Sequence, residues 1–83
     1  MSVYVDNMRA KVGRLLLSHM IADTLDELHQ MATLIGVARR WFQDKTVPHY
    51  DICATKRKHA IVLGAIMVDR RQLGEIIRRI KRK

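Results

Sequence analysis

Two histidines and three aspartates stand out in this chain, because each falls near the expected end of a strand or helix. They are Asp6, His19, Asp23, His49 and Asp51. In open α/β domains, ligands bind at the ends of strands. Imidazole and carboxylate groups are ligands for a divalent ion, and they also supply the base and the acid for phosphodiester cleavage. The pattern predicts one polar site, with a divalent metal as candidate cofactor.

The same residues also have structural explanations. His19 on an apolar strand face is typical of a hydrogen-bonded core histidine, and Asp6 and Asp23 are typical of turns and caps. Together the five residues would also form a polar network that holds a small core in one arrangement. The sequence contains no Cys-x-x-Cys, His-Glu-x-x-His, glycine-rich phosphate loop or Gly-x-Ser-x-Gly motif, which excludes most familiar enzymes.

Positive charge is the second chemical feature of the chain. Sixteen Lys and Arg residues against eight Asp and Glu give a net charge of +8. Such an excess favours nucleic acid or an acidic protein as the partner. The charge is concentrated near the C-terminus, where residues 69–83 contain seven cations and two acidic residues. The alternative is a solvated helix face with a frayed tail.

Two groups of residues are predicted to contact a polyanionic partner. In the middle of the chain, cations lie near an expected helix N-terminus, which is an anion site, and Trp41 or Tyr50 can stack on a base. In the last helix, cations fall outside the apolar stripe. The predicted contacts are Arg40, Trp41, Lys56, Arg57, Arg78, Arg79 and Arg82. Trp41 and Tyr50 are equally well explained as core anchors.

The elements that must position these groups follow from periodicity and capping signals. Strands are predicted at 3–5, 15–22, 37–43 and 66–68. Capping boxes headed by Thr24 and Asp69 predict two helix starts, a third lies near Thr55, and Gly36 and Gly64 are expected helix ends. The prediction is a small single α/β domain over residues 1–83. It has about four short, mainly parallel strands and three helices in two or three layers, with a basic C-terminal tail at 78–83.

Length and composition narrow the class of protein. Eighty-three residues make one domain. The longest uncharged stretches, such as 15–22, are far shorter than the roughly 20 residues of a membrane span, and the start lacks the basic region of a signal peptide. The lone Cys53 cannot form an internal disulfide and is best explained as an apolar filler. We therefore expect a cytoplasmic protein without a membrane partner.

Seven short motifs run through most of the chain. They are Val3-Tyr4-Val5-Asp6, His19-Met20-Ile21-Ala22-Asp23, Glu27-Leu28-His29, Arg39-Arg40-Trp41-Phe42-Gln43, His49-Tyr50-Asp51, Lys56-Arg57 and Leu63-Gly64-Ala65. In this order they resemble a family of small uncharacterised domains found in phages and bacteria. The resemblance covers residues 3 to about 73. It implies a phage or prophage origin, hence the host cell cytoplasm, and it implies no activity.

Two functions of different classes remain. The favoured one is a small basic accessory protein of phage type that binds nucleic acid or an acidic host protein, because so short a chain has little room to enclose a substrate away from water. The alternative is a metal-dependent phosphodiesterase or nuclease. In it, Asp6, Asp23 and Asp51 hold a metal or a water. His19 or His49 acts as general base, and Arg40 or Lys56 stabilises phosphate charge.

Overall fold

The computed structural model describes residues 2–7 and 10–81 of the chain. Its elements, in chain order, are β1 (Val3–Asp6), β2 (Ala10–Val12), β3 (Leu15–Ala22), α1 (Leu25–Leu34), the 3-10 turn η1 (Arg39–Trp41), β4 (Tyr50–Cys53), α2 (Ala54–Val62), β5 (Ile66–Val68) and α3 (Arg70–Lys81). The predicted strands at 3–5, 15–22 and 66–68 and the three predicted helices are therefore present.

The strands form one mixed sheet around β3. One edge of β3 pairs with β2 and β1 in turn, and the other edge pairs with β4. These three pairings are antiparallel, and β5 alone among the described strands runs parallel to its neighbour, β1. The predicted mainly parallel sheet is therefore wrong. β2 and β3 are joined through Gly13, whose φ of 61° suits glycine in a tight turn, and a hairpin needs no crossover helix.

The sequence is also misleading between α1 and α2. It predicts a strand over 37–43, but this segment contains η1, and Gln43 makes one isolated bridge to His49. The strand of this region is β4, which pairs with β3 and buries Tyr50 and Ile52 on the same face. Pairing with β3 and burial of two large side chains decide the position of the strand, and local β-propensity does not.

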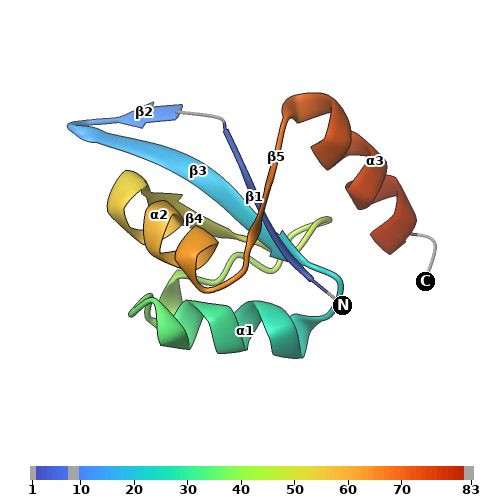
Figure 1. Cartoon of the computed structure of the whole chain (residues 1–83), viewed down its shortest axis with the longest axis horizontal. Helices are drawn as coiled ribbons and strands as arrows, with labels where there is room; N and C mark the ends of the chain where they lie inside the picture. Colours follow the sequence, from blue (N-terminus) through green and yellow to red (C-terminus); the bar gives the residue numbers. More distant parts are fainter. Residues whose placement is uncertain (1, 8–9, 82–83) are drawn as a thin grey trace.

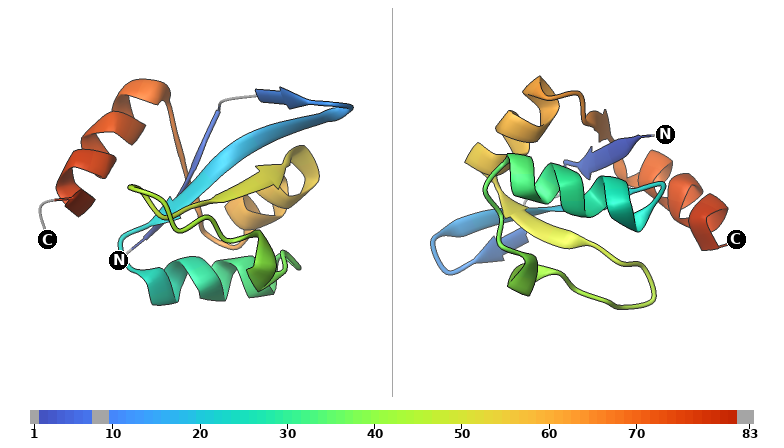
Figure 2. Two further views of the ribbon diagram at one scale, coloured as in Figure 1. Left: turned by 180° about the vertical axis from the view of Figure 1, so that it is seen from behind. Right: turned by 90° about the horizontal axis from the view of Figure 1, so that it is seen from below.

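Helices cover both faces of the sheet, which gives three layers (Figure 1). α1 and α2 lie on one face, and α3 lies on the other (Figure 2). Successive strand residues point to opposite faces, so Val5 packs in the core under α1 and α2 while Tyr4 packs under α3. The apolar stripe of α3 consists of Leu73, Ile76, Ile77 and Ile80.

The helix boundaries agree with the predicted capping signals. The Thr24 hydroxyl accepts the Glu27 amide at 3.2 Å, and the Asp69 carboxylate accepts the Gln72 amide at 2.8 Å. Just beyond α1, Gly36 has a φ of 78°, in the left-handed region that closes many helices. These local signals act within one turn of chain, which is why they can be predicted without knowledge of the sheet.

The C-terminal end of α3 carries part of the predicted basic tail. The helix runs to Lys81, so residues 78–81 are helical, while Arg82 lies outside the described residues. Among the helices that the structure describes, none has the length and apolar character needed to cross a bilayer.

Candidate metal centre

Four of the five predicted site residues converge on the α3 face of the sheet. Asp6 ends β1, and its carboxylate accepts the main-chain amide of His19 on β3 at 2.9 Å. On the other edge of β3, the ladder places Asp51 of β4 directly opposite His19. His49 lies two residues before Asp51, so both side chains point to the same face. Because β3 lies between β1 and β4, three segments far apart in sequence supply one cluster.

Asp23 does not join this cluster. β3 runs antiparallel to β1, so the end of β3 lies beside the start of β1 and away from Asp6. There the Asp23 carboxylate accepts hydrogen bonds from the Ser2 amide at 2.9 Å, the Tyr4 hydroxyl at 3.1 Å and Arg79 Nη2 at 3.0 Å. Burial acts to raise the pKa of Asp23, but these hydrogen bonds and the Arg79 charge outweigh it and hold the pKa below its ordinary value.

The hydrogen bonds of the two histidines fix which ring nitrogen carries a proton. His19 Nδ1 lies 2.8 Å from Asp6 Oδ2, and His49 Nδ1 lies 2.8 Å from the main-chain oxygen of Val47. Carbonyl and carboxylate oxygens accept hydrogen bonds, so each Nδ1 acts as the donor. In the neutral rings, each Nε2 then carries a lone pair.

Both Nε2 atoms face one oxygen of Asp51. Each lies 3.6 Å from Asp51 Oδ1, which is too long for a hydrogen bond. The three ligand atoms lie within 4.8 Å of one another. Around a tetrahedral zinc ion with ligands at about 2.0 to 2.2 Å, neighbouring ligand atoms are about 3.3 to 3.6 Å apart. The two separations from Asp51 Oδ1 match those of neighbouring ligands on one cation, and the two ring nitrogens lie within 4.8 Å of each other.

Each ligand is held by a partner of its own. Asp6, with a side chain only 3% exposed, orients His19, and the Val47 carbonyl orients His49. Gln43 Nε2 donates to the second Asp51 oxygen at 2.6 Å. Such outer partners are typical of metal sites, where they set the tautomer and orientation of the ligands. The Val47 contact has no sequence signal because it uses a main-chain atom.

Two cavities border His19 and give ligands access to it. One, of about 250 Å³, is lined by His19, His49, Lys45 and apolar residues that include Leu73. The other, of about 320 Å³, is lined by Asp6, Asn7, His19, Arg70 and Leu73. One cationic side chain lines each cavity, Lys45 the first and Arg70 the second. The sequence predicts neither of them as a site residue. Their positions depend on how α3 and the segment before His49 pack beside β3.

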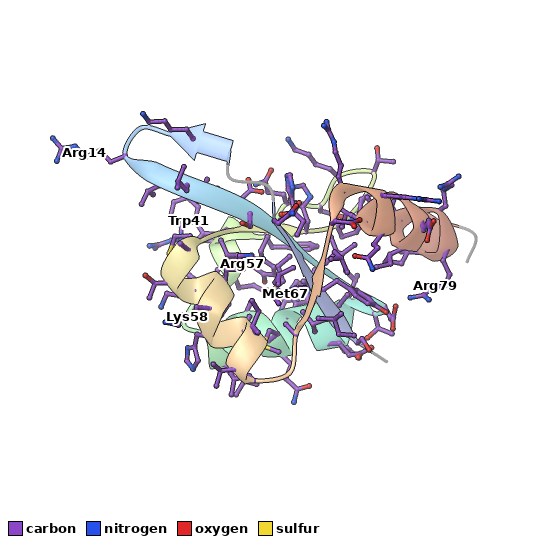
Figure 3. All side chains as sticks on the ribbon, turned by 45° about the horizontal axis from the view of Figure 1, so that its top comes forward. Arg14, Trp41, Arg57, Lys58, Met67 and Arg79 are labelled. Carbon is purple, nitrogen blue, oxygen red and sulfur yellow. The ribbon has the colours of Figure 1, made fainter. Side chains whose placement is uncertain are left out.

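The predicted nucleic-acid contacts are distributed over different parts of the molecule. Arg79 is engaged by Asp23 and Tyr4, and Arg57 Nε donates to the main-chain oxygen of Asp6 at 2.7 Å. Trp41 and Arg79 lie toward opposite ends of the molecule (Figure 3). Arg78 is exposed on α3, whereas Arg40, Trp41 and Lys56 border a separate groove. These residues therefore do not form one binding surface.

The chain is thus a small three-layer α/β domain in which two histidines and one aspartate form a candidate set of metal ligands. The chain belongs to the family described as "protein of unknown function (DUF4031)", whose model matches residues 3–80. This match confirms the resemblance to a family of small domains without an assigned activity. No curated protein and no solved structure matches the chain. Phage origin stays a prediction.

Proposed function

We propose that the protein is a divalent-metal-dependent phosphodiesterase whose ion is held by His19, His49 and Asp51. The observation that carries the proposal is the pair of 3.6 Å distances from the two Nε2 atoms to Asp51 Oδ1. A polar network that serves stability alone places donors against acceptors. Here, with both imidazoles neutral, three acceptor atoms face one another, and a cation is the partner that they can share.

The ligand set favours a catalytic ion over a structural one. Three protein ligands leave a coordination position for water or substrate, whereas structural zinc sites are closed by four protein ligands. Imidazole and carboxylate donors together suit zinc, manganese or iron. The site also reaches solvent, because the side chains of His19 and Asp51 are 31% and 32% exposed.

A phosphodiester is the substrate class that best fits the surroundings. Lys45 and Arg70 line the two cavities that border His19, and the net charge of +8 attracts polyanions. A divalent ion held by His19, His49 and Asp51 would polarise a phosphoryl oxygen and activate water as the nucleophile. The water oxygen forms the new bond to phosphorus, the bond to the leaving alcohol breaks, and a proton passes through solvent to that alcohol. Lys45 and Arg70 offset the phosphate charge.

The roles of individual residues differ from those expected from the sequence alone. His19 and His49 are proposed ligands, because their Nδ1 protons are already donated and their Nε2 atoms face Asp51. Asp6 is a proposed positioning residue that orients His19. Asp23 supports the fold from just past the C-terminal end of β3.

Hydrolysis of bis(p-nitrophenyl) phosphate by protein stripped of metal and reloaded with zinc, manganese or ferrous iron tests this function. We expect turnover with at least one ion and loss of turnover in Asp51→Asn. Asp23→Asn is the matched control, because it makes the same substitution outside the cluster, and it should retain turnover. Wild-type protein inert with all three ions would contradict the proposal, as would full activity in Asp51→Asn.

A nucleic-acid-binding accessory protein without catalysis is the second candidate, and one observation favours it. Trp41 is 59% exposed beside Arg40, an arrangement that suits base stacking. Under this alternative, a phage-type protein in the host cytoplasm would bind nucleic acid through its basic surface, and the histidine cluster would stabilise the fold. Binding without cleavage in the presence of metal would distinguish it from the phosphodiesterase.

A further inference from the structure

A groove of about 550 Å³ lies between the η1 segment and β4. Its apolar lining includes Leu17 of β3 and Ile52 of β4, and its polar lining includes Arg40 and Lys56. Asp51 and Gln43 also line it, and these two residues are joined by the 2.6 Å hydrogen bond at the metal centre. The groove therefore adjoins the proposed metal centre but differs from the two cavities that border His19.

Trp41 is the most informative residue of this groove. Its side chain is not a core anchor, because it is 59% exposed on a 3-10 turn. The Arg40 guanidinium carbon lies 5.5 Å from the centre of the indole ring, a distance within the range of cation–π contacts. An exposed aromatic ring beside an arginine is an arrangement on which nucleic-acid bases stack.

Lys56 supplies a second cation to the groove. If Gly36 were replaced by a residue with a Cβ atom, that atom would lie only 3.1 Å from Lys56 Nζ. The glycine therefore leaves room for the ammonium group beside the end of α1. Gly36 also has a φ of 78°, which disfavours other residues at this position. The groove thus combines an apolar lining and a stacking ring with two cations, a set complementary to unpaired bases on a phosphate backbone.

We propose that this groove binds a segment of single-stranded nucleic acid, with a base stacked on Trp41 and phosphates on Arg40 and Lys56. A duplex keeps its base faces stacked inside the helix and cannot offer one to Trp41. The bound strand continues past Gln43 toward Asp51, which makes single strands the substrate of the metal centre. That last step rests on the proposed function, whereas binding in the groove does not.

Intrinsic fluorescence measures the binding directly, because Trp41 is the only tryptophan in the chain. The protein is titrated with oligothymidylate in EDTA, which removes the metal contribution. We expect saturable quenching that weakens with salt, and much weaker quenching by a duplex of equal length. Absence of quenching at low salt, or equal quenching by duplex, would overturn the proposal.

Paired charge variants test whether the groove cations carry the affinity. Arg40→Gln/Lys56→Gln and Arg14→Gln/Lys58→Gln each remove two positive charges, but Arg14 and Lys58 are exposed outside the groove lining. Only the first pair should flatten the plot of log affinity against log salt, by about 0.7 for each cation. In fluorescence anisotropy with a labelled strand, Trp41→Ala should lose about tenfold or more in affinity. Equal losses in both charge pairs would overturn the proposal.

The groove and the metal centre can fail separately. Hydrolysis of the small chromogenic diester does not need the groove, and strand binding in EDTA does not need the metal. Strand binding without hydrolysis would support the groove proposal and contradict the phosphodiesterase proposal. Hydrolysis without strand binding would support the phosphodiesterase proposal and contradict the groove proposal. Concentration-dependent self-association in sedimentation, reduced by Trp41→Ala and without strand binding, would assign the groove to a second copy of the chain and overturn the proposal.

Discussion

Two aspartates beside β3 each belong to a polar cluster, but the partners of the two carboxylates are of opposite kinds. Asp51 of β4 lies opposite His19 in the interior of β3, and Asp23 lies just past the C-terminal end of β3. At Asp23 the carboxylate accepts hydrogen bonds from an amide, a hydroxyl and a guanidinium. At Asp51, Gln43 donates to one oxygen, while the other faces two imidazole nitrogens whose Nδ1 protons are donated elsewhere. The first arrangement is satisfied without a ligand, and the second is the one that the proposed cation would complete.

The comparison supplies a criterion that separates a structural carboxylate from a proposed metal ligand when both are only partly buried. Both residues are aspartates near a strand boundary, so neither residue type nor position along the chain separates them. The nature of the facing atoms does. Burial acts to raise the pKa of Asp23, but the donors around it outweigh burial and lower the pKa. The atoms around Asp51 are instead those that the proposed metal site requires.

Asp51→Asn should have the largest effect. We expect the affinity for zinc to fall by about a hundredfold or more, because one of three ligands is lost. Mutation of a residue that only orients a ligand typically costs about tenfold to a hundredfold. The metal-free variant should be as stable as the wild type or more so, because the Asn amide can donate to the histidine Nε2 atoms. Calorimetric titration and thermal unfolding in EDTA measure both. Unchanged zinc affinity would remove Asp51 from the ligand set.

Asp6→Asn tests whether the outer partner of His19 matters. Loss of the carboxylate that holds His19 Nδ1 should lower zinc affinity by about tenfold to a hundredfold. Arg57 donates to the main chain of Asp6 and keeps that bond in the variant. The same titration measures the effect, with circular dichroism as the control for folding. Wild-type affinity in a folded variant would show that Asp6 does not position the ligand.

Asp23→Asn should reverse the pattern of Asp51→Asn. We expect a loss of about 1 kcal/mol in the free energy of unfolding, because charge-assisted hydrogen bonds become neutral ones, and no change in zinc affinity. The native pKa of Asp23 is lowered, so its contribution is complete above its ordinary pKa and disappears as pH falls through the native value. Urea unfolding of both proteins should therefore converge in strong acid. A difference that persists there would contradict this origin.

His29 should produce the smallest effect, on the opposite face of the sheet. Its Nδ1 lies 2.7 Å from the Tyr50 hydroxyl. Burial and then the Arg39 charge lower the pKa of His29, with Asp26 opposing them. The unfolded chain therefore takes up a proton first as pH falls, and stability decreases below the ordinary histidine pKa of about 6.5. In EDTA, His29→Gln should flatten this decline in urea unfolding; an identical pH profile would assign the decline to other groups.

Local signals in the sequence predict much of the fold. They predict much less of the strand pairing, which depends on residues far apart in the chain. The capping boxes at Thr24 and Asp69 are complete within four residues, so both helix starts are predicted correctly. The strand predicted over 37–43 is wrong because β4 occupies the edge of β3 that such a strand requires. The parallel sheet is wrong because the hairpin at Gly13 is not predicted.

The candidate site shows the same division. His19, His49 and Asp51 can be selected by residue type and position, and the structure brings them together with Asp6. Asp23 is grouped with them only if the strands are parallel, since antiparallel pairing sends the end of β3 to the start of β1. Main-chain contacts such as that of Val47 are independent of the side chain at that position. Neither the exclusion of Asp23 nor these contacts can be predicted without the sheet.

Long-range proton–nitrogen NMR of the four histidines tests the metal centre most directly, because His29 and His59 lie outside the cluster and serve as internal controls. Above about pH 8, where ordinary imidazoles are neutral, His19 and His49 should both be protonated at Nδ1. One equivalent of zinc should then shift only their Nε2 signals, and Asp51→Asn should prevent that shift. Protons found on Nε2 of His19 and His49, or zinc that shifts none or all four of the histidines, would contradict the account.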